Sequence, residues 1–183
     1  PRVVLVACAL AGFIALGFEV LWFRSLTLIF GSTTYSFSAM LAGFLLGIGL
    51  GSFLLGMVVD RVRNLLLLFA LAEIGIGLYI WLAMHRFDEQ PEYLLGRLAA
   101  HGVTWPVMLT SQFLITLKFL FVPTALMGVA FTAAGKLVRL AHPDPARAVA
   151  AVYSWNTVGC VLGSLVAGFV LLPVFGLERS LEI

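Results

Sequence analysis

Four residues stand out because each is charged or aromatic and lies inside a long apolar stretch of the sequence. Glu73 falls near the middle of one stretch and Lys118 near the middle of another, while Glu19 and Trp22 lie one helical turn apart in the first stretch. A carboxylate in such surroundings can hold a cation or a proton, and an aromatic ring attracts an amine by cation–π interaction. These four side chains are the candidates for chemistry.

Glu73 and Lys118 would lie at comparable depth if their stretches formed antiparallel helices across a bilayer. A charge at the bilayer centre costs about 2.5–3.5 kcal/mol on insertion scales, so such residues usually face the bundle and find partners. We therefore predict an intramembrane ion pair between Glu73 and Lys118. It would serve either as a fixed salt bridge between helices or as a lock that responds to protons or substrate.

Glu19 is the candidate site for a cation or a proton, with Trp22 supplying an aromatic face. Arg24 is five residues from Glu19, about 140° around a helix of 3.6 residues per turn, so these two do not simply pair. In the alternative interpretation, Glu19 accepts a hydrogen bond between helices. Trp22 would then anchor the chain at the membrane boundary, where aromatic residues collect.

Five long apolar runs must position these side chains, and they make up nearly all of the chain. The mean hydropathy is +1.09, and 11% of the 183 residues are charged, against about 25% in a soluble domain. Each run is long enough to supply the roughly 20 helical residues that span a bilayer core, and no period-two alternation indicates a barrel. We predict a single all-α integral membrane domain over residues 1–183, a polytopic bundle of five complete spans and the start of a sixth. The predicted spans are 3–30, 35–59, 65–84, 106–135 and 149–175.

The positions of the lysines and arginines predict a cytoplasmic N-terminus, because positive residues favour the cytoplasmic side. The longest loop, 85–105, would then lie outside and carry a short surface helix. We expect a multi-pass protein of the bacterial cytoplasmic membrane, with the lipid bilayer as its partner; the net charge of +2 gives no case for nucleic acid. Residues 177–183 read like a loop that leads into a further spanning helix. The residues expected inside are Arg2, Arg61, Arg63, Lys136, Arg139 and Arg147, and those expected outside are Arg24, Arg86, Arg97 and Arg179.

No residue is assigned to catalysis, and we expect no metal or cofactor in this segment. Cys8 and Cys160 both lie in apolar runs, where cysteine behaves as a small apolar residue. The Gly-Ile-Gly-Leu-Gly sequence at residues 47–51 resembles a nucleotide-binding loop, but it lies inside a predicted helix and follows no strand.

Small residues recur at helical spacing in two of the runs. Gly43, Gly47 and Gly51 are four residues apart, and Gly159 and Gly163 repeat the spacing in the last run. Such a face lets another helix approach closely. The glycines would serve either for close packing alone or as smooth faces that slide during a transport cycle.

Asn156 is expected near the cytoplasmic mouth of the last run. We predict that it ties neighbouring helices by hydrogen bonding, with ligand binding as the alternative.

The sequence from Gly56 to Asn64 resembles the loop between helices two and three of major facilitator transporters. A glycine, three residues and then Asp60-Arg61 match that pattern, although Arg63 stands where a second glycine is expected. The resemblance implies that Asp60 and Arg61 form a latch between helix ends on the cytoplasmic side. An ordinary charged turn is the alternative, since basic loops are expected there in any case.

Several segments together resemble the membrane region of bacterial proteins that fuse a facilitator-like helical domain to a spermidine-synthase-like domain. They are residues 17–24 (Gly-Phe-Glu-Val-Leu-Trp-Phe-Arg), 30–32 (Phe-Gly-Ser), 123–128 (Pro-Thr-Ala-Leu-Met-Gly) and 153–159 (Tyr-Ser-Trp-Asn-Thr-Val-Gly). The resemblance implies half of a facilitator fold, with an aminopropyltransferase domain of the same chain beyond residue 183.

By this resemblance the domain would anchor polyamine chemistry at the membrane and move a polyamine or related cation. A facilitator-type transporter fragment with no enzyme attached is one alternative. A purely structural membrane anchor is another.

Overall fold

The computed structural model describes residues 2–31, 34–87, 89–141 and 143–182. Within these ranges the chain is helical and contains no strand. Five helical segments are long and apolar enough to cross a membrane, which confirms the predicted all-α architecture. In chain order the elements are α1 (Arg2–Phe30), α2 (Thr34–Val58), the 3-10 turn η1 (Val59–Arg61), α3 (Leu65–Met84), α4 (Gln90–His101), α5 (Trp105–Leu140), α6 (Pro145–Val166), the π-helical η2 (Ala167–Leu171) and α7 (Leu172–Glu182).

Local signals in the loops determine where two of these helices begin. The Asn64 side chain accepts a hydrogen bond from the Leu67 amide at 3.0 Å and so caps α3. Asp144 caps α6 through the amides of Ala146 and Arg147. Each cap satisfies amide groups that the first turn of a helix leaves without partners.

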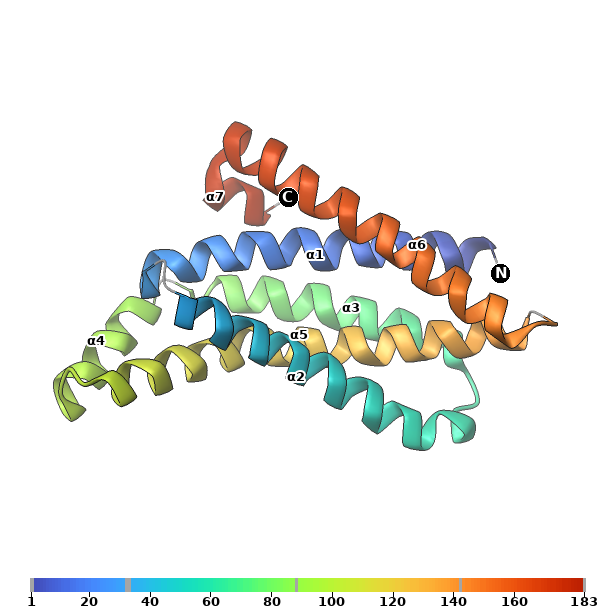
Figure 1. Ribbon diagram of the computed structural model, residues 1–183, viewed down its shortest axis with the longest axis horizontal. Coiled ribbons are helices and arrows are strands. Elements are labelled where there is room, and N and C mark those ends of the chain that lie inside the picture. Colours follow the sequence, from blue (N-terminus) through green and yellow to red (C-terminus); the bar gives the residue numbers. More distant parts are fainter. Residues whose placement is uncertain (1, 32–33, 88, 142, 183) are drawn as a thin grey trace.

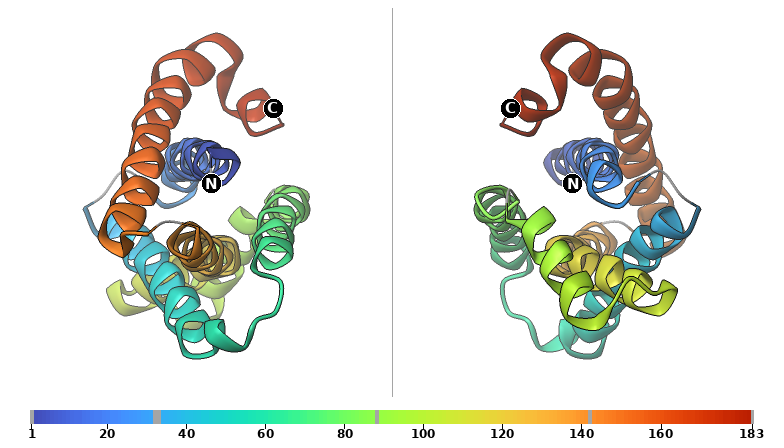
Figure 2. Two further views of the ribbon diagram at one scale, coloured as in Figure 1. Left: turned by 90° about the vertical axis from the view of Figure 1, so that its right-hand side faces the viewer. Right: turned by 90° about the vertical axis from the view of Figure 1, so that its left-hand side faces the viewer.

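The long helices run side by side along the longest axis of the molecule in alternating directions (Figure 1). Helix α1 packs mainly against α6, while α2 and α3 pack mainly against α5. Figure 2, which looks along the helices, shows α1 and most of α6 on one side and α2, α3 and α5 on the other. The bundle therefore consists of two closely packed groups that meet along a less extensive contact.

Glycines allow the close approach of α2 to α5. Gly43, Gly47 and Gly51 are buried on the face of α2 that meets α5. A Cβ atom added to Gly51 would overlap the backbone oxygen of Ala125, and one added to Gly47 would overlap the side chain of Thr124. The spacing seen in the sequence thus corresponds to a contact in which backbone lies directly on backbone.

The contact between α1 and α6 is built in the same way. Cβ atoms on Gly159 and Gly163 would overlap the backbone oxygens of Ala9 and Phe13. On the α1 side, Gly12 faces the backbone oxygen of Asn156. Both helix groups are therefore held by contacts that tolerate no added methyl group at these positions.

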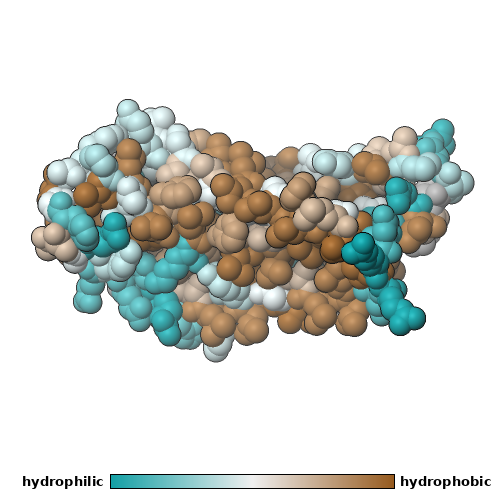
Figure 3. All heavy atoms as spheres, turned by 90° about the horizontal axis from the view of Figure 1, so that it is seen from below, coloured by the Kyte–Doolittle hydropathy of each residue, from teal (hydrophilic) through white to brown (hydrophobic). Residues whose placement is uncertain are grey.

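The outer surface of the bundle is apolar along most of its length. Large side chains such as Leu45, Ile74 and Phe169 are exposed, and Figure 3 shows an apolar band with hydrophilic residues gathered toward both ends. An exposed apolar area of this extent is unusual for a protein surrounded by water.

Helix α4 occupies the long loop where a short helix was predicted. It lies beside the N-terminal part of α5 (Figure 1), where Arg97 donates a hydrogen bond from Nε to Ser111 Oγ at 3.0 Å. Gln90, its first residue, is buried. The loop is thus attached to the bundle and does not extend away from it.

The end of the last long segment departs from a straight helix. A π-helical turn replaces α-helix over Ala167–Leu171, and Gly176 within α7 has φ 74°, the left-handed region that favours glycine. The ribbon folds back after this break (Figure 1). The sixth spanning helix stays a prediction.

Candidate functional site

A cavity of about 370 Å³ lies between the two helix groups, and all five long helices contribute to its wall. Its volume is in the range of about 300–1,000 Å³ that is usual for small-molecule sites. Most of the lining is apolar, including Phe44, Phe69 and Phe131. Its polar lining residues are Cys8, Ser52, Glu73, Tyr153, Asn156 and Cys160.

Glu73 is the one ionisable carboxylate in the described lining, and no basic side chain accompanies it there. It lies on α3 between the buried residues Phe69 and Ile76. Among the residues that the structure describes, none forms a hydrogen bond or an ion pair with the Glu73 side chain. The cavity therefore presents one carboxyl group, surrounded by aromatic and aliphatic side chains, whose polar atoms are open to a ligand.

The predicted ion pair between Glu73 and Lys118 does not form in the structure. Lys118 Nζ instead lies 3.4 Å from Gln90 Oε1 of α4. The Tyr79 hydroxyl donates to the backbone oxygen of Lys118, so Lys118 is level with Tyr79. That position is about 9 Å along α3 from Glu73, at 1.5 Å per residue. The prediction was wrong because the two residues differ in depth and because α4 supplies Lys118 with another partner.

Trp22 is not placed to receive an amine. It is 2% exposed, and its ring packs against Phe87 and Phe119 with centroid separations of 5.5 and 5.2 Å. The proposed cation–π role is therefore wrong for this structure, because core side chains cover the ring. Glu19 is half-buried and is not in the lining of the cavity. The structure thus does not combine Glu19 and Trp22 into an open site.

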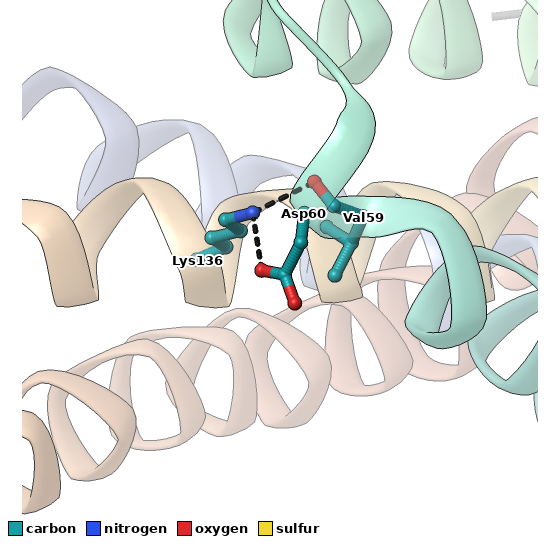
Figure 4. A network of polar contacts seen from close by, with 3 residues as sticks. All are labelled: Val59, Asp60 and Lys136. Atoms are coloured by element: carbon teal, nitrogen blue, oxygen red, sulfur yellow. Dashed lines mark hydrogen bonds and ion pairs between the residues drawn. The ribbon is translucent and has the colours of Figure 1, made fainter.

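Asp60 links the end of the second span to α5, but its partner is Lys136 and not Arg61. Lys136 Nζ lies 2.7 Å from Asp60 Oδ1 and 2.7 Å from the Val59 backbone oxygen (Figure 4). Within the described ranges, Arg61 makes no hydrogen bond or ion pair. Lys136 had no predicted partner, since its nearness to Asp60 depends on how α5 packs on α2.

A second depression, a cleft of about 440 Å³, opens beside this ion pair at the same end of the molecule. Lys136, Asp60 and Arg139 give it a charged rim. The cleft and the central cavity have Ser52, Phe131 and Tyr153 in common. Phe131 and Tyr153 were not predicted as site residues, because aromatic residues are common throughout the chain and nothing in their spacing marked these two.

Asn156 lies where the packing of α6 and the central cavity meet. Its backbone oxygen and side-chain oxygen face Gly12 of α1, and Nδ2 lies 3.6 Å from Cys160 Sγ one turn further along α6. Asn156 also lines the cavity. It is therefore placed for both of the roles considered for it, a contact between helices and a polar group for a ligand.

The chain matches no family model, no curated protein and no solved structure.

Proposed function

We propose that this chain is a membrane domain whose central cavity binds a small organic cation carrying one positive charge, with Glu73 as the counter-ion. The observation that carries the proposal is the carboxyl group of Glu73, which lies in an apolar cavity without a partner among the described side chains. The five long apolar helices cross the bilayer, and the exposed apolar band faces lipid.

The chemistry of the wall suits an amine. The Glu73 carboxylate would balance its charge, the rings of Phe44 and Phe69 offer cation–π attraction, and Asn156 can accept a hydrogen bond. An uncompensated charge away from water is costly, so the ligand and the carboxylate each lower the cost of burying the other.

The same lining disfavours a polyamine as the preferred ligand. Spermidine carries three positive charges, and one carboxylate leaves two of them without a counter-ion in an apolar space. We therefore narrow the expected cargo from polyamines and related cations to monoamines. Fusion to a spermidine-synthase-like enzyme, the half-facilitator fold and a location in the bacterial inner membrane with the N-terminus in the cytoplasm remain proposals that rest on the sequence.

The test is amine binding to the protein in lipid nanodiscs, measured by calorimetry with butylamine, putrescine and spermidine. Butylamine is expected to bind most tightly. Glu73→Gln keeps the size of the side chain and removes its charge, and we expect it to weaken butylamine binding by about 30-fold or more, as for loss of one member of a buried charge pair.

Glu19→Gln is the matched control, because it makes the same chemical change in an apolar helix outside the cavity lining. It should leave butylamine binding unchanged. Equal losses in the two variants, or butylamine binding that survives Glu73→Gln, would show that Glu73 is not the counter-ion. A protein that binds none of the three amines would favour the structural anchor.

A further inference from the structure

The rings of Phe131 and Tyr153 lie at the boundary between the central cavity and the cleft at the end of the bundle. Both residues line both spaces. Phe131 belongs to α5 and Tyr153 to α6, and their rings meet edge to face with centroids 4.9 Å apart and an angle of 80° between their planes. The contact therefore joins one helix from each of the two groups that enclose the cavity.

The two spaces differ sharply in character. The cleft has Asp60, Lys136 and Arg139 at its rim, whereas the described lining of the cavity contains Glu73 as its one charged side chain. An ion that passes from the cleft to Glu73 must leave this charged rim and go by the aromatic pair. Ser52 of α2 completes the shared boundary.

We propose that the cleft is the aqueous entrance to the Glu73 cavity and that the Phe131–Tyr153 pair is its gate. The proposal rests on the proposed function for its cargo, a small cation. Separation of the two rings opens the path, and their edge-to-face contact closes it. The ion pair of Lys136 and Asp60 holds the end of α2 against α5 on one side of the entrance.

The two cysteines of the chain report on this path without requiring transport. Cys8 and Cys160 both line the central cavity and neither lines the cleft. A cationic, membrane-impermeant methanethiosulfonate modifies a cysteine when the thiolate attacks its sulfur, forming a mixed disulfide and releasing methanesulfinate. The labelling rate in nanodiscs, followed by mass spectrometry, therefore measures how readily a small cation enters the cavity from water.

Removing either ring should open the entrance. Tyr153→Ala and Phe131→Ala are each expected to speed labelling about tenfold. Loss of an edge-to-face ring contact should raise the fraction of molecules with an open entrance by about that factor. Tyr153→Phe keeps the ring and should label like the wild type. Phe37→Ala breaks another edge-to-face ring pair, with Phe23, that lines neither space, and it too should leave the rate unchanged.

A large side chain at Gly135 should close the entrance and slow labelling. Gly135 lines the cleft, and a Cβ atom added to it would meet no atom within 4 Å. Gly135→Phe should therefore fill the entrance without disturbing the helices, and the double variant Gly135→Phe/Tyr153→Ala should label slowly again. A misfolded Tyr153→Ala protein would remain rapidly labelled in the double variant, so this pair separates opening of the gate from unfolding.

Unchanged labelling in both Tyr153→Ala and Phe131→Ala would overturn the gate. Labelling of Gly135→Phe alone at the wild-type rate would overturn the cleft as the entrance. Neither result depends on amine binding. A protein whose labelling follows the expected pattern while Glu73→Gln binds butylamine normally would retain the entrance and lose the proposed counter-ion. If Glu73→Gln weakens butylamine binding but the labelling rates do not follow the expected pattern, Glu73 remains the counter-ion and the entrance lies elsewhere.

Discussion

At the scale of single residues, two glycines of one helix give opposite expectations for the same substitution. A methyl group on Gly51 would overlap the backbone of Ala125 on α5, whereas one on Gly49 would meet no atom within 4 Å. Gly51→Ala must therefore move two helix backbones apart, and we expect it to lower the free energy of unfolding by about 1–3 kcal/mol. Gly49→Ala should be neutral or stabilising by up to about 1 kcal/mol, because alanine favours a helix over glycine.

Thermal unfolding of the two variants in the same detergent measures the difference. Similar midpoints for Gly51→Ala and Gly49→Ala would mean that α2 and α5 do not meet at the glycine face.

The sequence identified Glu73 as a candidate functional residue but could not identify its surroundings. Glu73 is conspicuous because charge is rare in apolar helices. Its side chain reaches the cavity because of how α3 is rotated about its own axis, and α3 is apolar on every side, so its sequence gives no amphipathic signal for that rotation. The predicted ion pair with Lys118 was wrong because the sequence does not reveal the rotation of α3. It was also wrong because a contact between Lys118 and Gln90 of α4 cannot be inferred from charge alone.

At the scale of elements, Lys136 ties the turn after α2 to the C-terminal part of α5 through two acceptors, the Asp60 carboxylate and the Val59 backbone oxygen. Its side chain is 13% exposed, while that of Asp60 is 86% exposed. Exposed ion pairs contribute little to stability, so Asp60→Asn should leave the unfolding midpoint nearly unchanged. Lys136→Met should cost more, about 1–3 kcal/mol, because the Val59 backbone oxygen also loses its donor.

Denaturation midpoints of the two single variants test this order. A larger loss in Asp60→Asn than in Lys136→Met would show that the carboxylate, and not the backbone oxygen, is the acceptor that matters.

The existence of the helices was easier to predict than their ends. The five apolar runs corresponded to α1, α2, α3, α5 and the α6–η2–α7 segment, since length and hydropathy suffice to identify such runs. Helix α5 continues to Leu140, past the predicted end at 135, and α6 begins at Pro145, before the predicted start at 149. These extensions contain charged residues such as Lys136 and Arg147, and hydropathy alone treats charged residues as loop.

At the scale of the whole molecule, the charges at the two ends of the bundle predict its direction across a membrane. Arg61, Arg63, Lys136, Arg139 and Arg147 belong to one end, and the other end carries fewer basic residues close to the spans, together with Glu89 and Glu92. Positive residues favour the cytoplasm. We expect a fluorescent reporter fused after Asn64 or Pro143 to be active in the cytoplasm, and alkaline phosphatase fused after His101 to be active outside.

The exchanged fusions provide the control, because each reporter should be silent at the other's positions. Alkaline phosphatase activity after Asn64 would mean that the bundle is inserted the opposite way. Activity of both reporters at one site would mean that the chain inserts in two orientations.

Under the proposed function, Glu73, the one carboxyl group in the described lining of the cavity, also predicts how a membrane voltage would act on the domain. An ionised Glu73 gives the empty cavity one negative charge, and a bound monovalent cation cancels it. If the domain carries the cation across the membrane, as the notion of a transported cargo requires, the loaded site presents no net charge to the electric field. The empty one carries a charge on which the field does work of up to about 2.3 kcal/mol per 100 mV. In a transport cycle, voltage would therefore act on the step in which the empty site moves back across the membrane, and the electric current would accompany that step.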